Sequence, residues 1–231
     1  WKTCLFPSIF PLLILSDFAL STNIIKLISE SIGKFFKIIF NIPKESAYVL
    51  FMAFFTGCPS NAKYIKDLLD NQIIDNISAI KILSMAQLYN PNLIITITTF
   101  LTFKSKLFLI IGNLFCNFLI GLINRHIKCN YSEGSKKQIS FSLTNSMSNA
   151  INTLLGILGS IVTFSALTSI FKINHPLFTG IFEITNGISK INTDEINALF
   201  MCAIMLSFGG LSIIYQIKGI LKEYKLDYTL Y

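Results

Sequence analysis

A polar stripe near the end of the chain carries the strongest candidate for chemistry. Its members are spaced four, three and four residues apart: Thr179, Glu183, Asn186 and Lys190. This spacing places them on one face of an otherwise apolar helix, which the pattern predicts to end near Asn186. A carboxylate among apolar side chains is rare unless it has a partner or a function, so Glu183 is the leading functional residue. The structural alternative is that Glu183 pairs with Lys190 or Lys63 and holds two parts of the chain together.

Three further polar interruptions break apolar runs. They read T-G-C-P-S-N-A-K at 56–63, Y-N-P-N-L at 89–93 and L-S-F-G-G-L-S at 206–212. Helix ends at such breaks leave N–H and carbonyl groups without partners, and these groups can bind a polar or anionic solute. The candidate solute-binding residues of the four interruptions are Thr56, Gly57, Ser60, Asn61, Lys63, Asn90, Glu183, Thr185, Asn186, Ser207, Gly209, Gly210 and Ser212.

The same interruptions also have purely structural interpretations. Residues 56–63 are compatible with an ordinary turn between two surface helices. Asn-Pro and Asn-Gly pairs are common helix terminators, which alone would explain Asn90 and Asn186. The pair Gly209-Gly210 would equally permit two helices to pack closely.

Other kinds of chemistry have little support in the sequence. Ser, His and Asp residues show neither a nucleophile elbow nor a triad order, so no catalytic residues and no enzyme are predicted. Five cysteines without a C-x-x-C spacing and two histidines indicate no metal site and no cofactor. The net charge of +7 comes from Lys and Arg scattered between apolar runs, which argues against nucleic acid as a partner.

The apolar runs themselves predict a membrane protein. The chain is 52% hydrophobic and only 13% charged. Uncharged runs near or above the roughly 20 residues that a spanning helix needs occur at 82–103, 107–124, 138–171 and 196–217. The predicted fold is therefore all-α, in a polytopic membrane protein of the bacterial cell membrane.

The first half predicts five elements. In chain order they are a proline-kinked span at 5–21, an amphipathic surface helix at 23–40, a re-entrant hairpin at 46–70, a helix at 77–103 broken at Asn90-Pro91, and a span at 107–123. The hairpin has its tip near Cys58 and Pro59, because its first arm is too short to span.

The second half predicts a similar order. A Ser- and Asn-rich amphipathic stretch at 139–152 leads into a span at 153–171, and Pro176 begins a short element that contains the polar stripe. Residues 192–195 cap a helix from about 196 that is interrupted at 207–210 and completed at 211–221.

These elements predict one membrane domain over residues 1–231, with pseudo-repeats at about 1–123 and 139–231. If the hairpin at 46–70 and a corresponding short hairpin from Pro176 do not cross the membrane, three crossings separate corresponding elements, so the repeats are inverted relative to each other. Lys and Arg in the loop at 124–138 place this basic loop in the cytoplasm, and residues 104–106 on the opposite side. The first residue, Trp1, and the apolar end at 226–231 favour an excerpt of a longer protein.

The three interruptions at 56–63, 89–93 and 206–212 and F-E-I-T-N-G at 182–187, taken in chain order, resemble the motifs of the YlbJ-like sporulation integral membrane proteins. The resemblance runs over about residues 5–221. Cys58 and Asn61 depart from the usual first motif, G-Y-P-x-G-A-K, where they replace the aromatic residue and the second glycine. The resemblance implies a polytopic protein of the cytoplasmic or forespore membrane that is needed for spore formation. It also implies a nucleoside-recognition or gate domain, related to one in nucleoside and ferrous-iron transporters.

The sequence thus favours a transporter-like protein that moves or binds a small polar solute at a midplane site. Its predicted partners are the lipid bilayer and a solute such as a nucleoside, with a homo-oligomer as an open alternative. The competing hypothesis is a membrane scaffold for spore assembly that transports nothing.

Overall fold

The computed structural model describes residues 5–22, 24–129, 141–224 and 226. Within these ranges the chain is helical and has no β-strand, which confirms the predicted all-α fold. The first half forms α1 (Leu5–Ser21), α2 (Ile24–Ile28), the π-helical turn η1 (Ser29–Gly33), α3 (Lys34–Phe40), α4 (Ser46–Thr56), α5 (Ser60–Asp70), α6 (Asn76–Met85), α7 (Pro91–Ile97), α8 (Phe103–Ile123) and the turn η2 (Asn124–His126). The second half forms α9 (Leu143–Ile170), α10 (Pro176–Phe182), α11 (Ile184–Ser189), α12 (Glu195–Phe208) and α13 (Gly210–Ile220).

Three helical stretches are long and apolar enough to cross a bilayer: Phe103–His126, Leu143–Ile170 and Glu195–Ile220. Each also exposes large apolar side chains; Phe115, Leu155 and Phe200 are 59%, 56% and 64% exposed. Water disfavours such surfaces, whereas lipid tails accommodate them. The chain is therefore a multi-pass membrane protein, as predicted.

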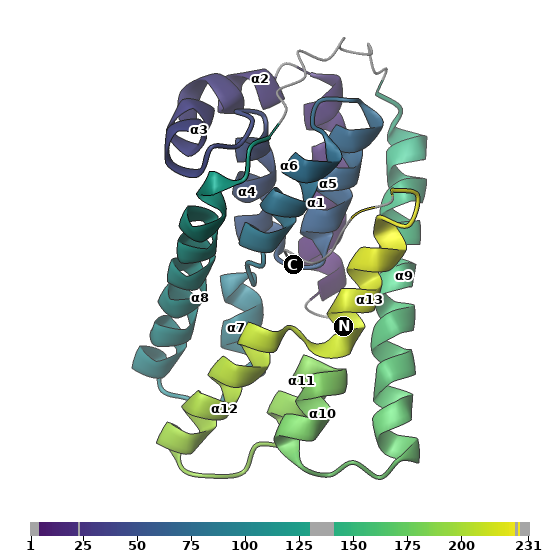
Figure 1. Ribbon diagram of the computed structural model, residues 1–231. Coiled ribbons are helices and arrows are strands. Elements are labelled where there is room, and N and C mark those ends of the chain that lie inside the picture. Colours follow the sequence, from purple (N-terminus) through teal and green to yellow (C-terminus); the bar gives the residue numbers. More distant parts are fainter. Residues whose placement is uncertain (1–4, 23, 130–140, 225, 227–231) are drawn as a thin grey trace.

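The helical segment 24–40 lies across one end of the molecule (Figure 1). It turns by 87° from α1, and its charged residues Lys26, Glu30, Lys34 and Lys37 are exposed while Ile25 and Phe40 are buried. The right angle to α1 and the four exposed charges agree with the predicted amphipathic surface helix, and the exposed side also carries the apolar residues Leu27, Phe35 and Ile38.

The first hairpin, α4 and α5, enters from that same end, and its tip at residues 57–59 lies at mid-height (Figure 1). Next to it α6 and α7 run in one direction, separated by the non-helical residues 86–90. The helix break therefore begins five residues before Pro91, earlier than the sequence predicts.

The second hairpin, α10 and α11, enters from the opposite end (Figure 1). Its tip is Glu183, whose backbone is extended at φ −148° and ψ 119°. The prediction of one continuous helix ending near Asn186 was wrong, because the chain breaks at Glu183 and α11 continues to Ser189. The predicted break between α12 and α13 is present, with Gly209 and Gly210 at φ +84° and +74°, which glycine adopts without strain.

Two other predictions concern the middle of the chain. The amphipathic stretch at 139–152 is not a separate element, since its described part from residue 143 is the beginning of α9. Hydrophobic residues later in α9 allow one helix of 28 residues to form. Of the predicted basic loop at 124–138, residues 130–138 lie outside the described residues.

The buried apolar residues form two cores. The first contains residues of the α4–α5 hairpin with α1, α6, α9 and α13, and the second contains residues of α7, α8, α11 and α12. The first hairpin thus packs against α6 and α13, and the second hairpin packs against α7 and α12. Between the hairpins the chain passes along α6–α7, α8 and α9, which gives the inverted arrangement predicted from the order of the elements (Figure 1).

Candidate functional site

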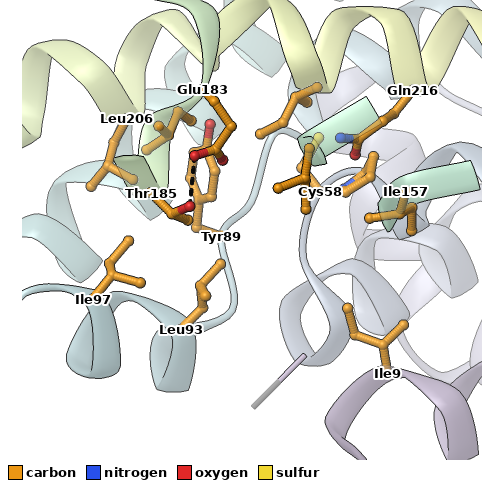
Figure 2. A pocket seen from close by; sticks show the side chains of 14 residues that line it. Ile9, Cys58, Tyr89, Leu93, Ile97, Ile157, Glu183, Thr185, Leu206 and Gln216 are labelled. Carbon is orange, nitrogen blue, oxygen red and sulfur yellow. Dashed lines mark hydrogen bonds between the residues drawn. The ribbon is translucent and has the colours of Figure 1, made fainter. Parts of the chain in front are cut away.

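A cavity of about 50 Å³ lies where the two cores meet (Figure 2). Eight of its lining residues are Ile or Leu, and its polar lining consists of Cys58, Tyr89, Glu183, Thr185 and Gln216. These five residues come from the first hairpin tip, the 86–90 break, the second hairpin and α13. The structure therefore gathers parts of three of the interruptions around one cavity, and Leu206 and Ile213, at the two ends of the fourth, also line it.

Glu183 is 5% exposed and caps the N-terminus of α11. Its Oε2 atom accepts a hydrogen bond from the Thr185 hydroxyl at 2.6 Å and another from the Asn186 backbone N–H at 2.7 Å. The helix breaks here because the extended backbone of Glu183 lets its own carboxylate satisfy the N–H groups that the new helix leaves bare. Lipid could not satisfy them.

The two lysines proposed as structural partners of Glu183 bond elsewhere. Lys190 donates to the Ile173 carbonyl at 2.6 Å and to Thr179 Oγ1 at 3.2 Å. Lys63 forms its ion pairs on α1 and α5. The ion-pair alternative for Glu183 is therefore wrong, and the carboxylate faces the cavity with hydrogen bonds only from its own helix among the described residues.

The first hairpin tip contacts the 86–90 break directly. A Cβ atom on Gly57, which has φ +75°, would lie 2.7 Å from the Asn90 nitrogen. The next residue, Cys58, donates its N–H to the Leu88 carbonyl at 2.7 Å, and its thiol lies 3.7 Å from Gln87 Oε1. Cys58 is 6% exposed and lines the cavity opposite the second hairpin.

Asn61 and Asn90 bind protein backbone and not the cavity. The Asn61 amide donates to the Ala86 carbonyl at 2.6 Å, and the Asn90 amide donates to the Phe55 carbonyl at 2.6 Å. Asn90 also caps α7, because its Oδ1 accepts from the Asn92 N–H at 2.8 Å. Both residues thus satisfy groups that the helix breaks leave open.

Two asparagines of α8 outside the predicted set also satisfy groups that the helix breaks leave open. Asn113 and Asn117 each donate to the Gln87 carbonyl at 3.2 Å, and Asn113 accepts from the Tyr89 N–H at 3.1 Å. Their spacing of four residues inside an apolar span was the signal, since it places two amides on one face of a spanning helix.

Gln216 of α13 is a polar lining residue that lies outside all four predicted interruptions. It is 4% exposed, and its Nε2 donates to Ser212 Oγ at 2.8 Å. Its Oε1 atom is buried without a hydrogen-bond partner. A lone glutamine within an otherwise apolar helix was the available signal.

The remaining predicted residues lie beside the cavity. Of the predicted set only Glu183 and Thr185 line it. The Asn186 side chain bonds Ser165 at 2.8 Å, the Thr56 hydroxyl bonds the Met52 carbonyl at 3.0 Å, and Ser60 is fully buried. Ser207, Gly209, Gly210 and Ser212 form the turn and first residues around the α12–α13 break.

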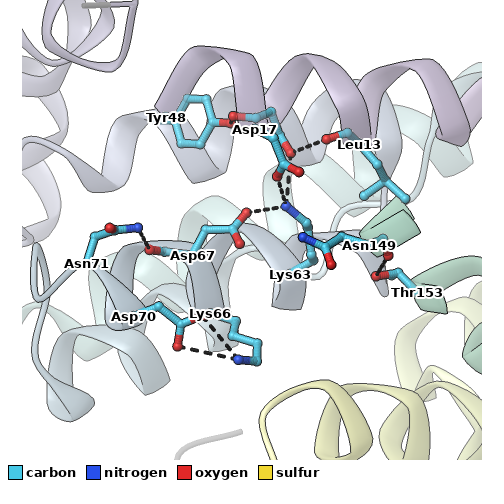
Figure 3. A network of polar contacts seen from close by, with 11 residues as sticks. Leu13, Asp17, Tyr48, Lys63, Lys66, Asp67, Asp70, Asn71, Asn149 and Thr153 are labelled. Atoms are coloured by element: carbon cyan, nitrogen blue, oxygen red, sulfur yellow. Dashed lines mark hydrogen bonds and ion pairs between the residues drawn. The ribbon is translucent and has the colours of Figure 1, made fainter. Parts of the chain in front are cut away.

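Lys63 belongs to a separate buried network (Figure 3). Its ammonium group donates to Asp67 at 2.6 Å, to Asp17 of α1, and to Ser16 Oγ at 3.4 Å. Tyr48 donates to the Ser16 carbonyl at 3.2 Å on the same side. This network fastens the first hairpin to α1 and leaves Lys63 out of the cavity lining.

No three His, Cys, Asp or Glu side chains in the described part of the chain are grouped so that they could hold a metal ion. The polar lining, a single carboxylate with hydroxyl, thiol and amide groups, suits reversible binding of a small solute.

Comparison with known proteins finds one relative that covers almost the whole chain. The chain is similar to the sporulation integral membrane protein YlbJ of Bacillus subtilis (strain 168), with 23% identity over 278 aligned positions. The alignment covers 96% of this chain and 68% of the relative. It confirms the predicted resemblance to YlbJ-like sporulation integral membrane proteins. No family model and no solved structure matches the chain.

Proposed function

We propose, from its similarity to a YlbJ-like sporulation membrane protein, that this protein is transporter-like and binds a small polar solute at the cavity between its two cores. The observation that carries the proposal is the meeting of both hairpin tips at one cavity that contains a carboxylate. Glu183, with Thr185, supplies the polar groups from the second hairpin, and Cys58 comes from the first.

The arrangement of the helices supports this proposal. Transporters built on inverted repeats place their sites near the bilayer midplane, between discontinuous helices that enter from opposite sides. Here α4–α5 and α10–α11 enter from opposite ends, and α6–α7 and α12–α13 are broken at mid-height (Figure 1). Irregular backbone at that depth is stable where it is buried in protein or lines a cavity.

The volume of the cavity bears on the size of the solute. Pockets for drug-sized ligands measure about 300–1,000 Å³. The cavity here measures about 50 Å³, so a nucleoside enters only if the hairpin tips move apart. Such a movement is what alternating access requires, and in this proposal the arrangement in which the hairpin tips meet is the closed form of the site.

The cellular process and the membrane that we propose for this chain follow from its similarity to the Bacillus subtilis protein. Its name assigns it to sporulation, and the resembled motifs imply a gate or nucleoside-recognition domain. We place this chain in the same process, in the cytoplasmic or forespore membrane. The alternative is a scaffold that spore assembly needs and that transports nothing.

A single substitution separates the two functions. Glu183→Gln keeps an oxygen that can accept from Thr185 and Asn186 while it removes the charge. We expect the variant to fold and insert normally but to fail in restoring spore formation to a host that lacks the native protein. Glu30→Gln, which removes an exposed carboxylate from the surface helix, is the matched control. Normal spore formation by Glu183→Gln, at wild-type protein levels, would support the scaffold.

A further inference from the structure

Three of the side-chain donors that face the cavity are engaged within the protein, and the Tyr89 hydroxyl, which also lines it, can both donate and accept a hydrogen bond. The Thr185 hydroxyl donates to Glu183 at 2.6 Å, and the Gln216 amide donates to Ser212 at 2.8 Å. The Cys58 thiol points at an acceptor in the 86–90 break, 3.7 Å away. With these three donors engaged, the carboxylate of Glu183 and the amide oxygen of Gln216 are the acceptors that a ligand can meet.

Glu183 provides the first of these acceptors. Among the described residues that line the cavity it is the only one that carries a charge. Both of its hydrogen bonds in the described chain end on Oε2, so Oε1 remains available. A single carboxylate surrounded by Ile and Leu side chains makes the cavity electronegative and poorly screened.

Gln216 provides the second acceptor, and it is independent evidence for a ligand. Its Oε1 atom is buried and has no hydrogen-bond partner, although the residue is 4% exposed. Leaving a buried amide oxygen unpaired is costly, so a partner from outside the chain is expected there. Figure 2 shows Gln216 and Glu183 in the same cavity, with Cys58 between them.

We propose that this cavity is a binding site for a small monovalent cation such as Na⁺, K⁺ or ammonium. Glu183 supplies the balancing charge, and Gln216 supplies a neutral oxygen. One carboxylate matches one positive charge, whereas divalent cations in proteins usually take six or more oxygen ligands, several of them carboxylates. A buried water needs roughly 10–15 Å³, so a cavity of about 50 Å³ holds a cation with a few waters.

This inference rests on the proposed function only in that it uses the same cavity. In a transporter, a cation at this position would be the coupling ion, and its binding would favour the closed form in which the two hairpin tips meet.

The test is the thermal unfolding midpoint of the purified full chain in detergent, measured in chloride salts of equal ionic strength. N-methyl-D-glucamine, which is too large for the cavity, is the reference cation. We expect Na⁺, K⁺ or ammonium to raise the midpoint saturably, by about 3–6 °C at ten times its dissociation constant. Comparison of the three salts identifies the preferred ion.

Variants assign the shift to this cavity. Glu183→Gln and Gln216→Leu should each abolish the selective shift, whereas Glu30→Gln should retain it. Gln216→Glu adds a second carboxylate and should lower the concentration needed for half of the shift; it decides the matter if Gln216→Leu does not fold. Equal midpoints in all four salts, or a selective shift that both cavity variants retain, would overturn the cation site.

The same data separate this inference from the proposed function. Loss of spore formation in Glu183→Gln without any selective cation shift in the wild type rejects the cation and leaves the solute-binding proposal standing. A selective shift that depends on Glu183, in a protein whose Glu183→Gln variant supports sporulation, rejects the transporter and retains the cation site.

Discussion

Gly57 and Asn90 are in contact through their backbones, and no side chain fits between them. A Cβ atom at position 57 would lie 2.7 Å from the Asn90 nitrogen and 3.3 Å from the Leu88 carbonyl oxygen. Because both are backbone atoms, relief requires the hairpin tip and the helix break to separate. This contact fixes the position of Cys58 in the cavity wall.

Gly57→Ala should therefore destabilise the protein strongly. Besides the clash, the backbone at φ +75° is one that residues with a Cβ rarely adopt. We expect a loss of about 2 kcal/mol or more, read as a lower midpoint in thermal unfolding followed by size-exclusion chromatography. Gly112→Ala in α8 is the control, since a Cβ there meets nothing within 4 Å. Equal midpoints for the two variants would contradict the tip geometry.

The ion network of Lys63 predicts that substitutions of its members have non-additive effects on the free energy of unfolding. The side chains of Lys63, Asp17 and Asp67 are only 8%, 16% and 15% exposed. Lys63→Met leaves two buried carboxylates without a counter-charge, which typically costs about 3–5 kcal/mol. Adding Asp17→Asn and Asp67→Asn to Lys63→Met should recover most of that loss. A triple variant no more stable than Lys63→Met would show that the carboxylates are not the cause.

The predicted orientation in the membrane places the two ends of α8 on opposite sides of the bilayer. The helix separates Lys106, near its start, from Arg125, just beyond its end. The charge bias of the connecting segments places Arg125 in the cytoplasm and Lys106 outside. Single cysteines at these positions, in a background without native cysteines, should react with impermeant thiol reagents from opposite sides of the membrane. Labelling of both from one side would exclude the topology.

The sequence predicted the parts of the fold that depend on local patterns. Apolar runs marked the three helical stretches that are long enough to cross a bilayer, and Pro91 and Gly209-Gly210 marked two breaks, because proline and glycine change the backbone locally. The break at Glu183 was missed for a physical reason. Spacing alone cannot distinguish a polar stripe on one helix from a carboxylate that caps a second helix.

The site was less predictable than the fold, since its lining depends on which elements meet. Asn90 and Lys63 have the chemistry of binding residues, but the first binds a carbonyl of α4 and the second binds carboxylates of α1 and α5. Asn117 and Gln216 stand out locally as amides in apolar runs, but the sequence does not show which element each amide meets. Only tertiary packing shows that Asn117 satisfies the helix break and that Gln216 faces the cavity.

The reactivity of Cys58 tests whether the cavity opens. Cys58 lines the cavity at 6% exposed, whereas Cys202 lies within the second core at 0%. We expect a variant with Cys58 as its sole cysteine to react with a small methanethiosulfonate, at a rate set by the movement of the hairpin tips, and a variant with only Cys202 to react at least tenfold more slowly. Mass spectrometry of samples quenched over time gives both rates.

A bound solute should slow the modification of Cys58 and leave that of Cys202 unchanged, because only Cys58 shares the cavity with Glu183. Protection should disappear in Glu183→Gln, in which the hairpin tips remain but the charge is lost. Equal rates for the two cysteines in the wild-type fold would mean that the first hairpin does not move. In that case the closed cavity would be a packing defect between the two cores, and the scaffold would be the better description.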